Sequence, residues 1–150
     1  MRIYQAGPLF SEAEQQWHRL FKRRLQQAGY DVVWPFELFS QQEVANWGEE
    51  APRRIMEADR NALDGCDVVI ALLDGAQVDD GTAWEIGYAF ARAIPVIGIR
   101  TDFRQGGDTG HSRVNAMIEG SCACIVSSSE EVLAALEELT AVRRARSLPE

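Results

Sequence analysis

Two acidic residues occupy positions where a predicted helix is expected to bury apolar side chains. The first is Asp59, which lies four residues after Ile55 and four before Leu63. That spacing puts Asp59 in the centre of the apolar stripe of a predicted helix over 50–64. A charge there is costly unless it is hydrogen-bonded or used in chemistry. The alternative is a skewed stripe, with Asp59 paired to Arg60 at its rim.

The second acidic residue is Glu85, which follows "DDGT" in the first turn of a predicted helix over 82–92. Helix dipoles stabilise carboxylates at this position, so a solvated glutamate is the simpler interpretation. Taken with Asp59, however, Glu85 supplies the groups for displacement at an anomeric carbon. One ionised carboxylate attacks the sugar, and a second, kept protonated by burial, donates a proton to the leaving group.

Alternating strands and helices must position these side chains. The predicted strands are 2–7, 30–35, 67–73, 94–99 and 122–128, each a nearly continuous apolar run. The predicted helices are 11–28, 50–64, 82–92, a short turn over 113–120, and 129–146; we expect 36–48 to be irregular and 146–150 to be a loose tail. Ser11 and Glu14 have the spacing of a capping box. The pattern indicates one α/β domain over 1–150, an open doubly wound sheet of five parallel strands with helices on both faces.

Sheets of this class bind ligands at the carboxyl ends of their strands, where the strand order reverses. The relevant loops therefore follow residues 6, 35, 73 and 100. They contain no Gly-x-Gly-x-x-Gly fingerprint and no Walker loop. The loop "DGAQVDDGT" is acidic and would repel a pyrophosphate. We predict neither a nucleoside triphosphate site nor a nicotinamide site, and no cofactor.

Composition excludes further classes. The 150 residues carry a formal net charge of −8, which argues against a nucleic-acid or anionic membrane surface. No apolar run approaches the ~20 residues of a membrane helix, and no secretory signal is evident. The three cysteines Cys66, Cys122 and Cys124 cannot all pair, and we expect buried, reduced thiols in a cytoplasmic protein. His18 and His111 offer no ligand spacing, so no metal site is predicted.

Three segments carry a family resemblance. "IYQAGPLF", "DGTAWEIGYA" and "VNAMIEG" occur in this order and together resemble the nucleoside 2-deoxyribosyltransferase family. The resemblance extends over nearly the whole chain. It implies a flavodoxin-like fold and transfer of 2-deoxyribose between purine or pyrimidine bases through a covalent glycosyl-enzyme. The expected substrates are 2′-deoxynucleosides and free nucleobases.

The resemblance also implies roles for individual residues. Glu85 would attack C1′ of the sugar, and Tyr4 would hydrogen-bond its carboxylate. Asp59 would protonate the departing base, and Asp79 would contact the sugar's 5′-hydroxyl. Burial of Tyr4 as an ordinary core residue is the alternative interpretation.

Other positions would complete the substrate site. The resemblance implies that Asn115 reaches the same hydroxyl from a neighbouring subunit, with Met117 beside it, so that a homo-oligomer shares its active site. Asn115 could instead simply cap a short helix. We also expect Gly7 in the first loop to contact the substrate, and Phe36 and Phe39 to stack on the base. Hydrogen bonds to the base would come from a glutamine at position 41 or 42.

Two alternative functions remain open from the sequence. Relatives hydrolyse the N-glycosidic bond of nucleoside 5′-monophosphates and tend to have serine where this chain has Asp79 and Asn115. An aspartate would repel a phosphate, although Arg100, Arg104 and Arg113 are candidates for binding one. The other alternative is a non-catalytic nucleoside-binding module, because a fold alone does not establish activity.

Overall fold

A computed structural model describes the backbone of residues 1–146 and the side chains of residues 1–142; the predicted tail from 147 onward lies outside this range. Five parallel strands form one sheet in the order β2-β1-β3-β4-β5. The strands are β1 (Arg2–Ala6), β2 (Asp31–Val33), β3 (Val68–Leu72), β4 (Val96–Ile99) and β5 (Cys124–Val126). The predicted flavodoxin-like, doubly wound sheet is thereby confirmed. Its strand order reverses between β1 and β3, which sets the expected ligand position at their carboxyl ends.

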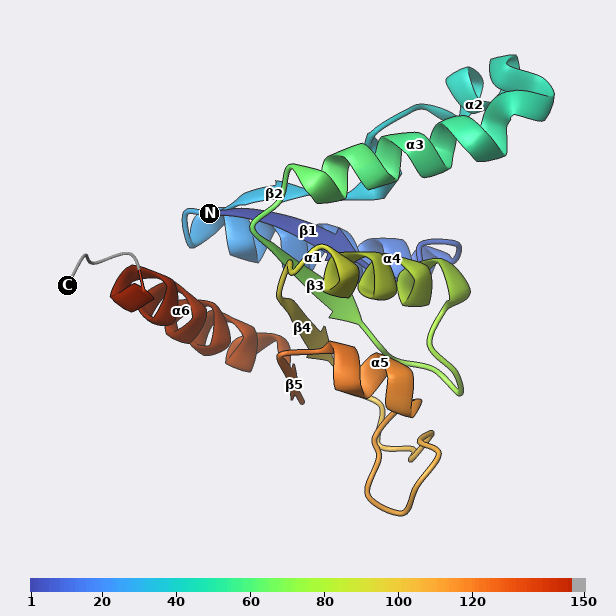
Figure 1. The fold of residues 1–150 in the computed structure, drawn as a ribbon. Helices are drawn as coiled ribbons and strands as arrows, with labels where there is room; N and C mark the ends of the chain where they lie inside the picture. Colours follow the sequence, from blue (N-terminus) through green and yellow to red (C-terminus); the bar gives the residue numbers. More distant parts are fainter. Residues whose placement is uncertain (147–150) are drawn as a thin grey trace.

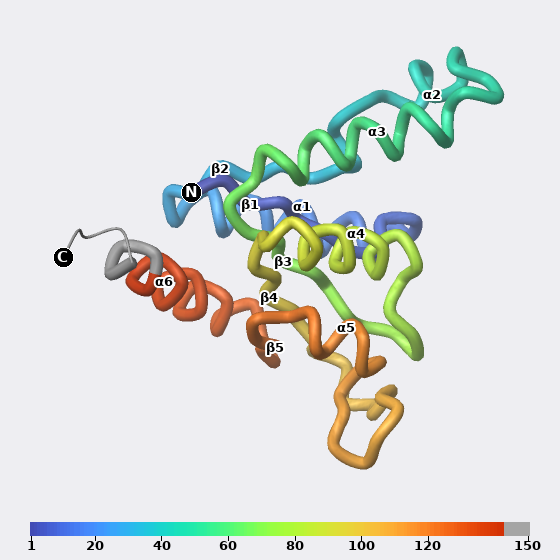
Figure 2. Tube along the Cα trace, viewed as in Figure 1, coloured from blue at the N-terminus to red at the C-terminus, as the bar shows by residue number. Residues whose placement is uncertain are grey.

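Six α-helices accompany the sheet in the described part of the chain (Figure 1). They are α1 (Glu12–Gln27), α2 (Gln41–Trp47), α3 (Ala51–Asp64), α4 (Asp80–Ala91), α5 (Ala116–Ser121) and α6 (Ser129–Arg146). Side chains of α1 and α6 form one core with the sheet, and side chains of α3, α4 and α5 form a second core on its other face. Figure 2 shows α2 and the start of α3 projecting beyond the sheet.

Alternation along β1 divides its side chains between the two cores. Ile3 packs in the core beside α1, whereas Tyr4 and Ala6 pack in the core beside α3 and α4. Successive residues of a strand point to opposite faces, so this period of two follows from strand geometry. Tyr4 is therefore aimed at α4, the helix that carries Glu85.

Capping boxes define two helix starts. At α1 the Glu14 N–H donates to Ser11 Oγ (3.2 Å) and the Ser11 N–H donates to Glu14 Oε2 (2.7 Å), as predicted. The same arrangement of Ser40 and Glu43 begins α2, with the Ser40 N–H donating to Glu43 Oε2 (2.7 Å). The prediction of an irregular segment over 36–48 is therefore wrong, because Ser-x-x-Glu satisfies the first backbone donors of a helix there. Single turns of 3₁₀-helix, Pro35–Glu37 and Gly48–Glu50, flank α2.

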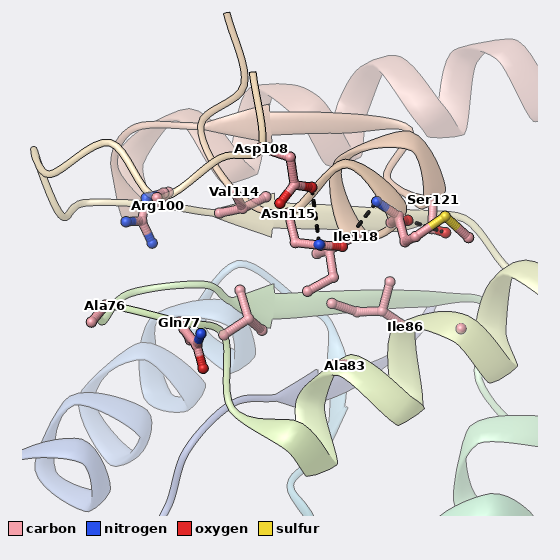
Figure 3. A pocket seen from close by; sticks show the side chains of 14 residues that line it. Ala76, Gln77, Ala83, Ile86, Arg100, Asp108, Val114, Asn115, Ile118 and Ser121 are labelled. Carbon is pink, nitrogen blue, oxygen red and sulfur yellow. Dashed lines mark hydrogen bonds between the residues drawn. The ribbon is translucent and has the colours of Figure 1, made fainter. Parts of the chain in front are cut away.

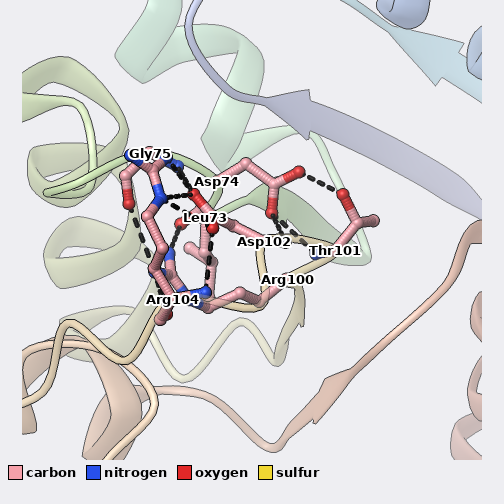
Figure 4. Close-up of polar contacts among 7 residues, drawn as sticks. All are labelled: Leu73, Asp74, Gly75, Arg100, Thr101, Asp102 and Arg104. Carbon is pink, nitrogen blue, oxygen red and sulfur yellow. Dashed lines mark hydrogen bonds and ion pairs between the residues drawn. The ribbon is translucent and has the colours of Figure 1, made fainter.

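A network of polar side chains, which we call the loop latch, joins the carboxyl ends of β3 and β4 (Figure 4). Its residues are Asp74, Arg100, Thr101, Asp102 and Arg104. The Asp74 carboxylate accepts the backbone N–H groups of Thr101 (2.6 Å) and Asp102 (2.9 Å). Arg100 is buried and donates to the carbonyl of Arg104 (2.9 Å) and to that of Leu73. The latch fixes the start of the loop that leads into α4.

The cysteines correct one expectation. All three are free, but only Cys66 is buried; Cys122 is half-buried and Cys124 is exposed. Cys124 lies on β5, the edge strand, where the sheet gives less cover.

No described helix is long and apolar enough to cross a membrane. Among the described residues, no group of three or more His, Cys, Asp or Glu side chains is placed to hold a metal ion.

Candidate active site

A cleft of about 700 Å³ opens at the carboxyl ends of β1 and β2 and at the start of α4. Its walls come from four segments: the loop after β1, the turn after β2 with α2, the face of α3, and the first turns of α4. The lining residues are Gly7, Leu9, Phe10, Pro35, Phe36, Phe39, Ser40, Gln41, Val44, Ile55, Asp59, Asp79, Gly81, Thr82 and Glu85. The cleft lies beside the reversal of strand order, where sheets of this class bind ligands.

The carboxylate of Glu85 on α4 is held by Tyr4, which points from β1 toward this helix. The Tyr4 hydroxyl donates to Glu85 Oε1 at 2.5 Å, and the Tyr4 side chain is fully buried. Short O–H···O⁻ bonds of this kind favour an ionised acceptor and fix its orientation. The strand thus fixes one carboxylate oxygen of a side chain that lines the cleft.

Asp59 contributes a second carboxyl group from α3. Its Oδ1 atom is buried and has no hydrogen-bond partner among the described residues. The neighbouring Arg60 donates instead to Asn61 Oδ1 at 3.2 Å, so the rim ion pair considered from the sequence is not formed. A buried carboxyl oxygen without a donor is costly as an anion, which favours the protonated form.

Burial shifts the proton affinities in the cleft upward. It raises the pKa of Glu85 to about 8; the hydrogen bond from Tyr4 opposes this shift, and the charges of Asp59 and Asp79 add to it. Burial likewise raises the pKa of Asp59 to about 6. Burial and the neighbouring Glu85 raise the pKa of Tyr4, which therefore stays a donor. Between about pH 6 and about pH 8 the two carboxyl groups together hold one proton.

Asp79 begins the helix that carries Glu85. Its Oδ2 atom accepts the backbone N–H and the hydroxyl of Thr82, both at 2.9 Å. Because Asp79 is the N-cap, α4 starts two residues earlier than the sequence predicted. The same side chain lines the cleft, so a capping residue also faces the substrate space.

The wall opposite the carboxylates is mostly apolar and aromatic. Phe36 and Phe39 line it, as predicted, and the Phe36 ring stacks on Trp34 with centroids 4.7 Å apart. Gln41 lines the cleft, whereas Gln42 turns away and donates to Asn46 Oδ1 at 3.1 Å. Sequence reasoning missed other lining residues: Leu9, Phe10, Pro35, Ser40, Val44, Ile55, Gly81 and Thr82. Recognising the capping box of α2 would have indicated that Ser40 and Val44 face this space.

Asn115 and Met117 do not line this cleft. They border a separate cavity of about 500 Å³ between α4 and α5, with Ile86 and Ala83 on its other side (Figure 3). Asn115 Oδ1 accepts the Met117 N–H (3.0 Å), and its Nδ2 donates to Asp108 (3.0 Å), so Asn115 caps α5. Within one chain, the structure therefore does not bring these two residues to Glu85.

The ionisable side chains that line the cleft are Asp59, Asp79 and Glu85, and no Lys, Arg or His is among the described lining residues. Arg100 and Arg104 belong to the loop latch. Arg113 donates to the carbonyl of Ile125 (3.1 Å) and to Ser127 Oγ (3.1 Å), away from the cleft. The cleft is thus acidic and apolar, which suits an uncharged ligand.

Fold and cleft define a flavodoxin-like α/β protein with a carboxylate-bearing ligand cleft at the carboxyl edge of its sheet. A sequence model of the nucleoside 2-deoxyribosyltransferase family matches residues 3–117, and the chain belongs to this family. An uncharacterized protein of Schizosaccharomyces pombe is 38% identical over 81 residues, which are 51% of this chain and 38% of that protein. The chain thus spans well under half the length of that curated relative.

Three solved structures share the fold. A conserved protein from Enterococcus faecalis V583 has a TM-score of 0.78 at 29% identity, covering 92% of this chain and 98% of its own. A 2-deoxyribosyltransferase from Bacillus psychrosaccharolyticus has a TM-score of 0.72 at 24% identity, covering 88% and 90%. A CMP N-glycosidase from Clostridium botulinum has a TM-score of 0.58 at 20% identity, covering 91% and 99%. The last two are less than 25% identical to this chain, so they support its fold alone, and the family rests on the sequence model over residues 3–117.

Proposed function

We propose that this protein is a nucleoside 2-deoxyribosyltransferase, with its catalytic unit formed by the whole segment 1–150. The observation that carries the proposal is the carboxylate of Glu85, held by the buried Tyr4 hydroxyl at 2.5 Å and facing the same cleft as Asp59. Two carboxyl groups in one cleft, one oriented by a donor and one without any, match the nucleophile and the acid of a double displacement.

The proposed first step forms a bond between a Glu85 oxygen and C1′ of the deoxyribose while the N-glycosidic bond breaks. The electron pair of that bond passes to the base nitrogen, and the proton of Asp59 neutralises the departing base. An incoming base then attacks C1′ from the face that the first base left and returns its proton to Asp59. Two inversions give net retention, and Glu85 is regenerated.

Charge in the cleft favours a free nucleoside over a nucleotide. A 5′-phosphate carries nearly two negative charges and is normally bound by arginines, hydroxyls or backbone amides. Asp59, Asp79 and Glu85 would instead repel it at short range. We therefore assign Asp79 to the sugar's 5′-hydroxyl, which can donate a hydrogen bond to a carboxylate.

The wall around Phe36 and Phe39 supports a broad range of bases. Stacking on aromatic rings depends little on base identity. Gln41 is an amide, which offers both a donor and an acceptor to the edge of a base. We expect purines and pyrimidines to be accepted, with Gln41 rather than Gln42 facing them.

The shared site remains a proposal about a second copy of the chain. Met117 is 78% exposed and lies across α4 from the cleft, so in an oligomer a partner would have to supply it. Mixing inactive Glu85→Ala and inactive Asn115→Ala protomers should restore activity, because one interface then holds an intact site. Mixed oligomers that stay inactive would contradict a shared site.

The direct test is the intact mass of the protein after brief exposure to a 2′-deoxynucleoside without an acceptor base. We expect a gain of one deoxyribosyl unit, which is absent in Glu85→Ala and discharged by adding a free base. Release of free base and sugar without an adduct would indicate a hydrolase. Binding without turnover would indicate a nucleoside-binding module.

A further inference from the structure

A row of buried aromatic rings connects α1 to the base-binding wall of the cleft. His18 on α1 stacks on Trp34 with ring centroids 5.5 Å apart, and Trp34 stacks on Phe36 at 4.7 Å. His18 and Trp34 are 0% and 1% exposed, respectively, whereas Phe36 lines the cleft. A polar ring at the closed end of this row requires an explanation, because burying its nitrogens is costly unless they are hydrogen-bonded.

Gln5 fixes the orientation of the His18 ring. The Gln5 side-chain amide donates to His18 Nδ1 (2.7 Å) and to the His18 carbonyl (3.0 Å). Both amide hydrogens are then used, so Nδ1 acts as an acceptor and the ring proton lies on Nε2. Burial lowers the pKa of His18 to about 4, opposed by the Pro8 carbonyl and the Glu14 carboxylate. His18 is thus a neutral ring in one defined orientation.

His18 also lies directly beneath the first loop of the cleft. A Cβ atom at Gly7 would lie 2.6 Å from His18 Cε1 and 2.7 Å from His18 Nε2. Gly7 has a φ of 151°, in a region that side chains other than glycine rarely adopt. The ring therefore determines how closely the Gly7 backbone approaches α1, and Gly7 lines the cleft.

We propose that His18 is a positioning residue for the substrate base. It touches no reacting atom. Through Trp34 it supports the ring of Phe36 on one side of the cleft, and through direct contact it supports Gly7 on another. The proposal rests on the function proposed above, because a base must occupy this wall.

The arrangement separates base binding from bond breaking. Gln5 and Tyr4 are consecutive residues of β1 and point to opposite faces of the sheet, toward α1 and toward α4 respectively. Loss of the His18 ring should loosen the wall that holds the base while leaving the bond between Tyr4 and Glu85 in place. KM for the nucleoside and for the free base should then rise more than kcat falls.

The test compares His18→Asn with Leu25→Ala. Asparagine can keep an acceptor for Gln5 but lacks the ring; Leu25 is equally buried on α1 and belongs to a core cluster that includes none of the residues lining the cleft. We expect His18→Asn to raise KM for deoxyadenosine and adenine roughly tenfold with kcat within about threefold, since about 1.4 kcal/mol of binding is tenfold. Leu25→Ala should lower the melting temperature and leave KM unchanged.

A second pair covers the case in which His18→Asn does not fold. Trp34→Phe keeps a ring between His18 and Phe36 and should retain KM near that of the wild type, whereas Trp34→Leu should raise it. Equal KM values for these two variants, or a KM rise in Leu25→Ala as large as in His18→Asn, would overturn the proposal.

Failure of the proposed function is distinguishable from failure of this inference. Adenine binding to Glu85→Gln by calorimetry tests the base wall without turnover, and the aromatic NMR resonances of Phe36 test its support without any ligand. Wild type that neither binds adenine nor turns over contradicts the proposed function alone. Unchanged Phe36 resonances in folded His18→Asn contradict the positioning role.

Discussion

Two groups of carboxylates lie along the carboxyl edge of one sheet and differ in how their oxygens are satisfied. In the loop latch, Asp74 accepts two backbone N–H groups, and Asp102 accepts the N–H and the side chain of Arg104. In the cleft, Glu85 accepts one hydroxyl, and Asp59 Oδ1 has no partner among the described residues. The latch shows how many donors a structural carboxylate accepts; Glu85 and Asp59 have fewer, whereas Asp79, which also lines the cleft, accepts two donors from Thr82 as the cap of α4.

The proton affinities follow the same division. Hydrogen bonds from Arg104 hold the pKa of Asp102 well below its usual range, whereas burial raises the pKa of Glu85 to about 8. Satisfied carboxylates stabilise the folded chain, while poorly satisfied ones cost stability and are retained where they perform chemistry. Substitutions in the latch should therefore change mainly stability, and substitutions of Glu85 and Asp59 should change mainly turnover.

The largest effect is expected on turnover when Glu85 is replaced. Glu85→Gln keeps the shape of the side chain but removes the charge that attacks C1′ in the proposed mechanism, so transfer should fall at least about 10³-fold. The matched control is Glu57→Gln, because Glu57 pairs with Arg53 (2.9 Å) outside the cleft. Each variant is incubated with deoxyinosine and adenine, and chromatography measures the deoxyadenosine formed. Retention of transfer by Glu85→Gln would end the nucleophile assignment.

The next effect concerns the proton donor. Asp59→Asn should slow transfer roughly 10²- to 10³-fold for ordinary bases, because an unprotonated base is a poor leaving group. A 7-methylated deoxyguanosine leaves as a neutral base without protonation, and its first step should stay near the wild-type rate. Equal slowing of both substrates would show that Asp59 acts by holding the structure.

The pH profile gives a second measurement on the same variant. With one proton shared by the pair, kcat/KM of the wild type should be bell-shaped with limbs near pH 6 and pH 8. Below the first limb both carboxyl groups are protonated, so no ionised nucleophile is present; above the second limb neither is protonated, so no acid remains. Asp59→Asn should lose the alkaline limb only. Loss of the acidic limb instead would reverse the two roles.

The sequence predicted the sheet and most helices because continuous apolar runs and capping residues are local signals. It also identified Asp59, whose place in an apolar stripe is visible without coordinates. It left the protonation state of Glu85 open, since a helix start lowers the pKa of a carboxyl group and burial raises it. Only the folded structure shows that burial dominates, because it raises the pKa of Glu85 despite the opposing hydrogen bond from Tyr4.

Other features depend on contacts between distant segments. In the sequence, His18 is only a metal-ligand candidate without a ligand spacing. The proposed positioning role depends on its contacts with Gln5 and Trp34, which only the fold brings next to it. In the loop latch, Asp74 bonds to Thr101 and Asp102, which lie 27 and 28 positions later in the chain. The sequence placed Asn115 at the start of a short helix, where it caps α5. That Asn115 lies outside the cleft could not be predicted, because this depends on how α5 packs against α4.

Stability should respond to the two carboxylate groups with opposite sign. The folded pKa of Glu85, about 8, exceeds its ordinary value of 4.5, so the folded state binds the extra proton between these values. Stability therefore falls as pH rises through this window, by at most about 1.4 kcal/mol per unit. Relative to the wild type, Glu85→Gln should gain at most roughly 3.5 kcal/mol between about pH 5 and about pH 8. Urea unfolding at both pH values measures this, and a constant difference would refute it.

Asp74→Asn should do the opposite and lower stability by about 1 kcal/mol at neutral pH, because a neutral amide oxygen accepts the two N–H groups at Oδ1 more weakly than a carboxylate, and the amide nitrogen replaces the oxygen that accepts the Thr101 hydroxyl. The loop between β4 and α5 should then exchange its amide hydrogens faster. Transfer should stay within about threefold of the wild type, since no latch residue lines the cleft. A loss of activity comparable to that of Asp59→Asn would place the latch in the catalytic machinery.

The smallest effect is expected for Arg104→Ala. Arg104 is more than half exposed, so its ion pair with Asp102 is screened by solvent, and its removal should lower stability only slightly. The Asp102 carboxylate keeps the N–H of Arg104 (3.0 Å) and that of Gly75 (3.2 Å) as donors, which limits the loss. Added salt should shrink the difference from the wild type further, because exposed pairs weaken as the Debye length shortens. A salt-independent loss as large as that of Asp74→Asn would mean that Arg104, rather than the backbone, holds the latch together.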